Sequence, residues 1–131
     1  MTSTDTLQAA ERHYLADQRL GRLATIDADG RLQNNPVGFH VHADGSLSIN
    51  GHALGATRKF RNVAGNPEVA FVVDDVRSVD PWVVRGVEIR GTADALTDVD
   101  PPAPWMSREE IRIHPRQIIS WGLDDAVGGV D

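Results

Sequence analysis

Apolar and polar residues alternate along much of this chain, which is the pattern of β-strands with one buried face. The first such segment is 20–26, and the dipeptide Asp29-Gly30 that follows it is a strong hairpin signal. The second segment, 31–42, contains Pro36, which has no N–H to donate to a neighbouring strand. This strand is therefore expected at a sheet edge or with a bulge at the proline.

Later segments continue the β pattern after a second turn signal at Asp44-Gly45. The unbroken apolar run 69–73 predicts a central strand, which the two aspartates after it are expected to end. Gly86 and Gly91 in the next strand allow the bending that a closed barrel requires. The remaining strands are expected at 47–50, 83–93 and, as a short pair broken at Pro115, 111–114 and 117–121.

Two segments are expected to be helical. A short amphipathic helix is predicted over 5–19, with Thr6 as its cap. The second helix lies within 51–66 and begins in the basic sequence GHALGATRKFRN. On a helical wheel, its apolar residues fall opposite its cations and amide: Ala56, Phe60, Val63 and Ala64 against Arg58, Lys59, Arg61 and Asn62.

The apolar arc of this basic helix can dock on a sheet, which leaves three cations and an amide displayed together near a helix start. Helix N-termini carry unpaired N–H groups and partial positive charge, so an anion is favoured there. The alternative reading is the solvated face of an ordinary amphipathic helix. Six or seven short strands with one inserted helix predict a single mainly β domain, a small antiparallel barrel spanning 1–131 with a mobile tail at 124–131.

Charge and composition exclude several classes of function. The formal net charge of −6 argues against nucleic acid or an anionic membrane surface as the main partner. The absence of cysteine excludes thiolate chemistry, and the five histidines show no metal-helix spacing, so no metal site is predicted. No apolar run is long enough to span a bilayer and no signal peptide is apparent, so a cytoplasmic location is expected.

Six segments in order resemble one family: GRLATIDADGR, NNPVGFH, GHALGATRKFRN, PEVAFVVDD, DPWVVRGVEIRGTA and IRIHPRQIISWG. They are similar to the split-barrel flavin and deazaflavin oxidoreductases related to pyridoxamine 5′-phosphate oxidase, over about residues 8–123. The actinobacterial branch that uses the deazaflavin coenzyme F420 is the most similar. The resemblance implies a six-stranded split β-barrel that forms a homodimer, with two cofactor sites shared across the subunit interface.

The resemblance also implies roles for individual residues. Those matching the strand segment that faces the cofactor ring are Asn35, Pro36 and Val37. The strand end before the basic helix, where an anionic ligand would approach, comprises Asn50, Gly51 and His52. The stretch matching the phosphate-binding residues comprises Thr57, Arg58, Lys59 and Asn62. The segment expected to reach the site from the partner subunit contributes Trp82 and Arg85.

Structural readings stand beside several of these roles. Gly51 is equally explained as a turn glycine, Trp82 as dimer-interface packing, and Arg61 as a member of a structural ion pair. The expected chemistry is hydride transfer between a deazaflavin and a small electron-poor substrate, which requires no acid–base pair. No catalytic side chain is therefore assigned, and the loop around 98–107 is expected to shape an undefined substrate pocket.

Other functions remain open at this level. A related enzyme using FMN would have the same fold but a single terminal phosphate on its cofactor. A non-catalytic cofactor- or haem-binding module would need an axial ligand, for which His40, His42 and His52 are candidates. Pyridoxamine phosphate oxidation itself is not expected, because the chain lacks the arginine-rich C-terminal segment with which those enzymes hold flavin and substrate.

Overall fold

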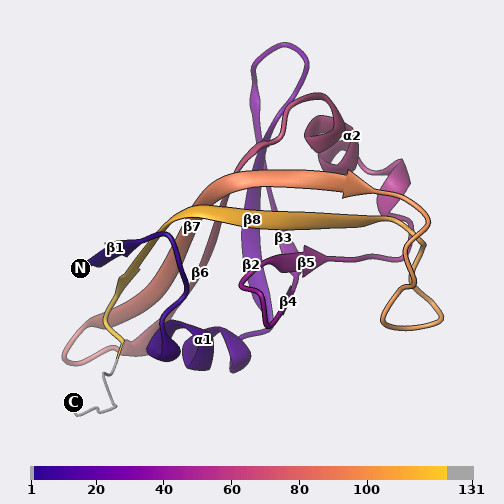
Figure 1. Ribbon diagram of the computed structural model, residues 1–131. Helices are drawn as coiled ribbons and strands as arrows, with labels where there is room; N and C mark the ends of the chain where they lie inside the picture. Colours follow the sequence, from indigo (N-terminus) through magenta and orange to yellow (C-terminus); the bar gives the residue numbers. More distant parts are fainter. Residues whose placement is uncertain (1, 124–131) are drawn as a thin grey trace.

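Eight strands form one antiparallel sheet in the computed structural model, which describes residues 2–123 (Figure 1). The predicted mobile tail at 124–131 lies outside the described residues. The strands are β1 (Thr2–Thr4), β2 (Leu20–Ile26), β3 (Leu32–Gly38), β4 (His40–Val41), β5 (Leu47–Ile49), β6 (Glu68–Ser78), β7 (Val83–Leu96) and β8 (Glu110–Trp121). The helices are α1 (Ala9–Ala16), the 3-10 turn η1 (Leu54–Ala56) and α2 (Arg58–Gly65). No helix among these is long and apolar enough to cross a membrane.

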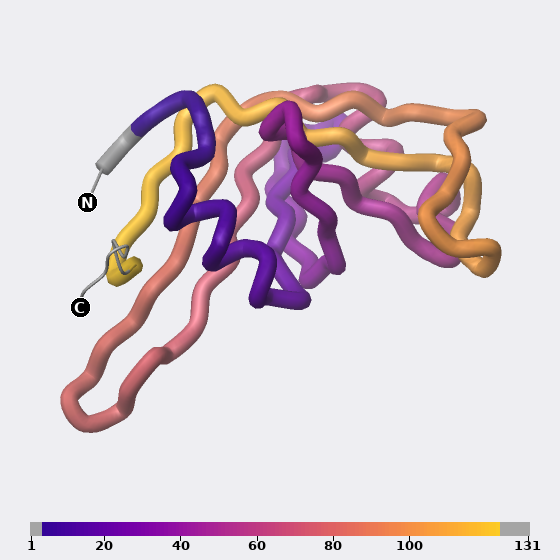
Figure 2. The backbone as a smooth tube through the Cα atoms, turned by 60° about the horizontal axis from the view of Figure 1, so that its bottom comes forward, coloured from indigo at the N-terminus to yellow at the C-terminus, as the bar shows by residue number. Residues whose placement is uncertain are grey.

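The sheet curls into a half-barrel. Its strand order is β3-β2-β6-β7-β8-β5-β4, with β1 paired to β8. Since β3 and β4 are separated only by Phe39 yet occupy opposite ends of this order, the sheet must bend until its two edges approach one another. The curled tube in Figure 2 shows this arrangement. Pro36 lies in edge strand β3, as predicted.

The mainly β fold is confirmed, but the expected number of six strands is wrong. The segment 31–42 divides into β3 and β4 at Phe39, whose ring packs edge-on against Phe71 with centroids 5.3 Å apart. Strand β6 does not end at Asp74 and Asp75, because both carboxylates pair with arginines of adjacent strands. Strand β8 runs through Pro115, where an irregular register opposite Gly91 accommodates the proline.

The core fills the concave side of the sheet and is closed by α1. Its fully buried side chains from strands β2, β5, β6, β7 and β8 are Leu23, Leu47, Ile49, Phe71, Val73, Val87, Ile89, Ile111, Ile113 and Ile118. Helix α1 contributes Tyr14 and Leu15 to the core. This helix is shorter than predicted and begins after Gln8, which forms a capping box with Glu11, so Thr6 is not its cap.

The far end of the β6–β7 hairpin projects from the body, as Figure 2 shows. Strand β2 pairs with β6 only from Ala70 to Val72, and β8 pairs with β7 only from Gly86 onward. We call the intervening residues 73–85 the β6–β7 arm. Its exposed apolar side chains are Val76, Val79, Trp82 and Val84.

Candidate functional site

Helix α2 starts at a well-formed cap. The Thr57 Oγ1 accepts a hydrogen bond from the backbone N–H of Phe60 at 3.3 Å and donates one to the carbonyl of Leu54 at 2.6 Å. The preceding turn is also bound to a distant loop, because Ser107 Oγ accepts a hydrogen bond from the N–H of Leu54 at 3.0 Å. The start of the helix is therefore fixed in place before any ligand binds.

The residues of α2 that face the sheet are not all those that the helical wheel predicts. Asn62 is buried, only 7% exposed, and its Nδ2 donates to Thr25 Oγ1 at 3.0 Å and to Gln33 Oε1 at 3.1 Å. Ala64, which was expected to face the sheet, is exposed. Asn62 belongs to the docking face because strands β2 and β3 present polar partners to it, which a hydrophobicity pattern alone does not reveal.

Two cations at the helix start have no side-chain hydrogen bond or ion pair within the described part of the chain. They are Arg58, which is exposed, and Lys59, which is half-buried. Lys59 lies one turn before Asn62 on the same helix face, the side towards β3. Arg61 instead donates from Nη1 to the carbonyl of Ala56 at 2.9 Å, so the predicted ion pair does not form with any carboxylate of residues 2–123.

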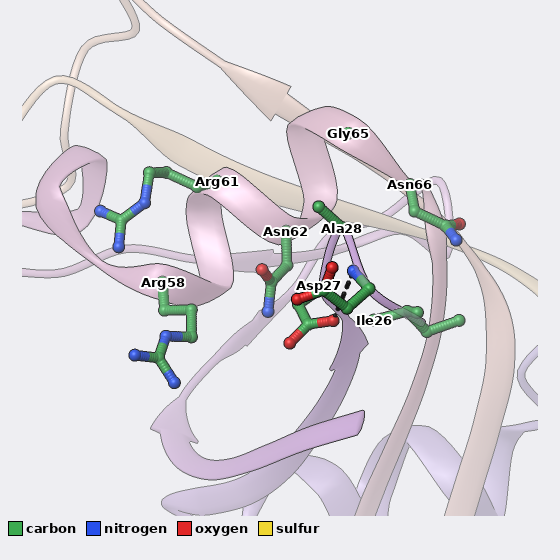
Figure 3. Close-up of a pocket in the computed structure, with 9 residues that line it drawn as sticks. Ile26, Asp27, Ala28, Arg58, Arg61, Asn62, Gly65 and Asn66 are labelled. Carbon is green, nitrogen blue, oxygen red and sulfur yellow. Dashed lines mark hydrogen bonds between the residues drawn. The ribbon is translucent and has the colours of Figure 1, made fainter. Parts of the chain in front are cut away.

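A surface pocket of about 600 Å³ opens between α2 and the β2–β3 turn (Figure 3). Its lining consists of Ile26, Asp27, Ala28, Asp29, Arg58, Arg61, Asn62, Gly65 and Asn66. Asn62 lies between the two arginines on one side and Asp27 on the other (Figure 3). The pocket thus combines the predicted cations with carboxylates, while Lys59 is outside its lining.

The carboxylate wall of this pocket was not predicted. Asp27 Oδ1 accepts hydrogen bonds from the backbone N–H groups of Asp29 and Arg31, each at 2.9 Å. An aspartate two residues before an Asp-Gly turn is a recognisable turn signal. That signal predicts the hairpin, but it carries no information about the position of the turn beside α2.

The predicted ring-facing segment is split between the two faces of the sheet. Asn35 pairs with Leu23 and Val37 with Gly21, so both side chains point to the core side, and Val37 is buried. Pro36 pairs with Arg22 and is exposed on the opposite side. Backbone groups of edge strand β3, rather than three side chains together, are what this segment offers to a ligand.

The strand end before the helix is tied to the loop 97–109. The carbonyl of Gly51 accepts from the backbone N–H of Ser107 at 2.9 Å, and Asn50 Nδ2 donates to Glu110 Oε1 at 3.4 Å. A Cβ at Gly51 would meet only Leu54, at 3.8 Å, so this chain does not itself require glycine there. His52 is exposed.

Glu109 makes a further contact in this region that sequence analysis missed. Its Oε1 accepts from the N–H of Gly55 at 3.1 Å, and a Cβ at Gly55 would lie 2.9 Å from Glu109 Cδ. This glycine therefore permits the loop 97–109 to pack closely on the turn before α2.

Trp82 and Arg85 belong to the β6–β7 arm, and this arm lies away from α2 in both Figure 1 and Figure 2. Trp82 is 66% exposed. Arg85 forms a bidentate ion pair with Asp75, with Nε–Oδ1 and Nη2–Oδ2 distances of 2.8 and 3.0 Å. One chain alone therefore does not bring these two residues to the basic helix.

Tyr14 completes this ion pair and was not predicted. Its hydroxyl donates to Asp75 Oδ1 at 2.8 Å, and the Arg85 guanidinium lies 5.0 Å from the centre of its ring. Burial, reinforced by the Asp75 carboxylate, raises the pKa of Tyr14 well above its ordinary value, so the hydroxyl stays a donor. The hydrogen bonds from Arg85 lower the pKa of Asp75, so the stability this contact contributes at neutral pH is lost as the pH falls below about 4.

Comparison with known proteins identifies the class. The model of the pyridoxamine 5′-phosphate oxidase family matches residues 7–121, so the chain belongs to this family. A putative pyridoxamine 5′-phosphate oxidase from Lactobacillus delbrueckii superposes with a TM-score of 0.68 at 23% identity, covering 91% of this chain and 99% of that one. A protein described as an F420 reductase superposes with a TM-score of 0.66 at 24% identity, covering 86% and 98%. At such identities these structures support the fold alone.

A more similar relative comes from Streptomyces rimosus. The chain is 51% identical over 113 residues to a 5a,11a-dehydrotetracycline/5a,11a-dehydrooxytetracycline reductase, covering 85% of this chain and 80% of the relative. Family membership and this relative confirm the prediction of an oxidoreductase.

Asn62→Ala tests the docking of α2. We expect the free energy of unfolding to fall by about 1–3 kcal/mol, because the buried hydroxyl of Thr25 and the amide of Gln33 lose their shared partner. Denaturant unfolding measures this change. The matched control is Asn34→Ala on exposed β3 surface, with an expected change within about 0.5 kcal/mol. Equal effects of the two substitutions would contradict the assigned role of Asn62.

Proposed function

We propose that this protein is a coenzyme F420-dependent reductase that transfers a hydride from the reduced deazaflavin to an electron-poor, conjugated double bond of a polycyclic substrate. The observation that carries this proposal is the 51% identity with a reductase of dehydrotetracyclines over most of both chains. The similarity of six segments to the F420-dependent branch supports the same cofactor.

The residues at the start of α2 fit an anionic cofactor. Arg58 and Lys59 are cations without side-chain partners within residues 2–123, beside the capped and fixed start of an eight-residue helix. Lys59 would hold a phosphodiester as a flexible point charge, and Arg58 would pair with a carboxylate through its planar fork. The Asn62 amide supports this site from behind, since its nitrogen is already engaged by Thr25 and Gln33.

A second copy of the chain would complete the site. The β6–β7 arm exposes Trp82 and three valines at a place that one chain leaves uncovered. Burying these apolar side chains favours association, and a twofold dimer would present each arm to its partner. Trp82 would then cover the reacting region and exclude water from it.

In this proposal the bound deazaflavin supplies the hydride, and the protein supplies position and shielding. Lys59 and Arg58 hold the anionic end, edge strand β3 offers backbone groups alongside, and Trp82 closes the opposite side. Orientation at close range accounts for a large part of the rate in such reactions. No side chain is assigned as proton donor, and in this proposal a proton from solvent completes the reduction of the double bond.

Turnover with 5a,11a-dehydrotetracycline as probe tests the proposal. We expect the purified protein to oxidise reduced F420 only when this acceptor is present, with loss of the reduced cofactor followed by absorbance and product identified by mass. The matched control is the same assay with reduced FMN. Reduction of the acceptor by FMN but not by F420 would contradict the assigned cofactor, and no turnover with either would contradict the assigned substrate class.

A further inference from the structure

The β6–β7 arm lacks a neighbouring strand on either side, so something other than the sheet must set its direction. Pairing to β2 stops at Val72 and pairing to β8 starts at Gly86. A two-stranded ribbon by itself is marginally stable in water. An anchor at its base is therefore needed if Trp82 is to be presented in one orientation.

Tyr14 of α1 provides that anchor. The residue is 4% exposed and its hydroxyl reaches across to Asp75 on β6, which at the same time holds Arg85 on β7. One carboxylate thus accepts three hydrogen bonds that join a core helix to both strands of the arm. The Arg85 guanidinium lies 5.0 Å from the centre of the Tyr14 ring, which adds a second attachment to the same helix.

A second ion pair near the base of the arm is weaker. Arg22 and Asp74 form an ion pair at 3.1 Å in which both side chains are about half exposed. Exposed pairs of this kind contribute little because water and salt screen them. Asp75 and Arg85 are more shielded, at 32% exposure each, and their geometry is bidentate.

We propose that the Tyr14–Asp75–Arg85 cluster positions the β6–β7 arm and so determines how Trp82 is held over the site of a second copy. This inference rests on the proposed function, which places Trp82 in the partner's site. Arg85 then acts through Asp75 on the arm, as a positioning residue, instead of contacting the cofactor itself.

Helix α2 and the Tyr14–Asp75–Arg85 cluster therefore have different roles. The cations of α2 determine affinity for the cofactor, whereas the cluster determines how well the substrate is covered. Loosening the arm should therefore raise KM for the substrate more than it weakens cofactor binding, because a displaced covering group leaves the substrate poorly oriented.

The test compares Asp75→Asn and Tyr14→Phe with Glu68→Gln. Glu68 also forms a bidentate pair, with Arg116, but at the opposite end of β6. Amide hydrogen exchange of residues 76–84, KM for 5a,11a-dehydrotetracycline and Kd for F420 are measured on each dimeric protein. Tyr14→Phe keeps the ring in the core, so it remains informative if Asp75→Asn does not fold.

We expect both arm variants to exchange residues 76–84 at least about threefold faster and to raise KM about tenfold, with Kd for F420 changed less than threefold. Glu68→Gln should alter none of these values. Unchanged exchange in the arm would overturn the anchoring, and faster exchange with unchanged KM would overturn the positioning of Trp82. If the wild-type protein does not bind F420, the proposed function fails, while the exchange data still decide whether the cluster anchors the arm.

Discussion

Lys59→Ala is expected to weaken F420 binding by about 1–3 kcal/mol, which corresponds to a roughly 5- to 150-fold increase in Kd. Lys59 is a half-buried cation in the first turn of α2, without a side-chain partner within residues 2–123. Its removal takes away a charge-assisted hydrogen bond from the anionic end of the cofactor and leaves no internal ion pair broken. Titration followed by quenching of tryptophan fluorescence measures the change.

Two further variants separate a specific contact from a change in net charge. Arg19→Ala removes one positive charge at the opposite end of β2 from the pocket, and its effect on Kd should be less than about twofold. Lys59→Arg keeps the charge and should restore most of the affinity. If Arg19→Ala and Lys59→Ala weaken binding equally, the basic helix returns to its reading as an ordinary solvated face.

Gly91→Ala is expected to lower the free energy of unfolding by about 3 kcal/mol. Gly91 is buried where the register between β7 and β8 shifts, and an added Cβ would overlap the backbone oxygen of His114 and lie 3.1 Å from the backbone nitrogen of Arg116. Both atoms belong to the main chain of β8, so the clash can be removed only if the backbone of the sheet moves. Urea unfolding measures the loss.

Gly65→Ala is the matched control for this prediction. Gly65 ends α2, where an added Cβ would meet no atom within 4 Å beyond its chain neighbours and its own helix backbone, and alanine favours helix more than glycine does. We expect a gain in stability of up to about 1 kcal/mol. Comparable destabilisation by the two substitutions would show that the close approach at Gly91 does not constrain the barrel.

Local signals in the sequence were sufficient for much of the fold. Strand β2 was predicted with its observed bounds, and the two Asp-Gly turns were correctly placed, since Gly30 and Gly45 adopt positive φ values of 81° and 91°. Turn chemistry of this kind depends on two adjacent residues. The predicted length of β6 was wrong. Two adjacent aspartates normally indicate the end of a strand, but here Asp74 and Asp75 pair with arginines of adjacent strands, and the sequence does not show those partners.

In the candidate site, too, local segments were predicted correctly and contacts between distant residues were not. The helix start with Thr57, Arg58 and Lys59 follows from a short segment, and the structure forms it as a capped helix with two unpaired cations within the described chain. The Asn62 side chain faces the sheet because it bonds Thr25 and Gln33, which lie 37 and 29 positions away in the sequence. The Tyr14–Asp75 contact spans 61 positions, so no local pattern could reveal it.

Parallel titrations of the purified protein with oxidised F420 and with FMN decide whether the basic start of α2 binds a deazaflavin. Quenching of tryptophan fluorescence gives both dissociation constants under the same conditions. We expect tight binding of F420 and clearly weaker binding of FMN, with the preference reduced in Lys59→Ala. Tighter binding of FMN, or binding of neither compound, would show that the basic start of α2 is not a deazaflavin site.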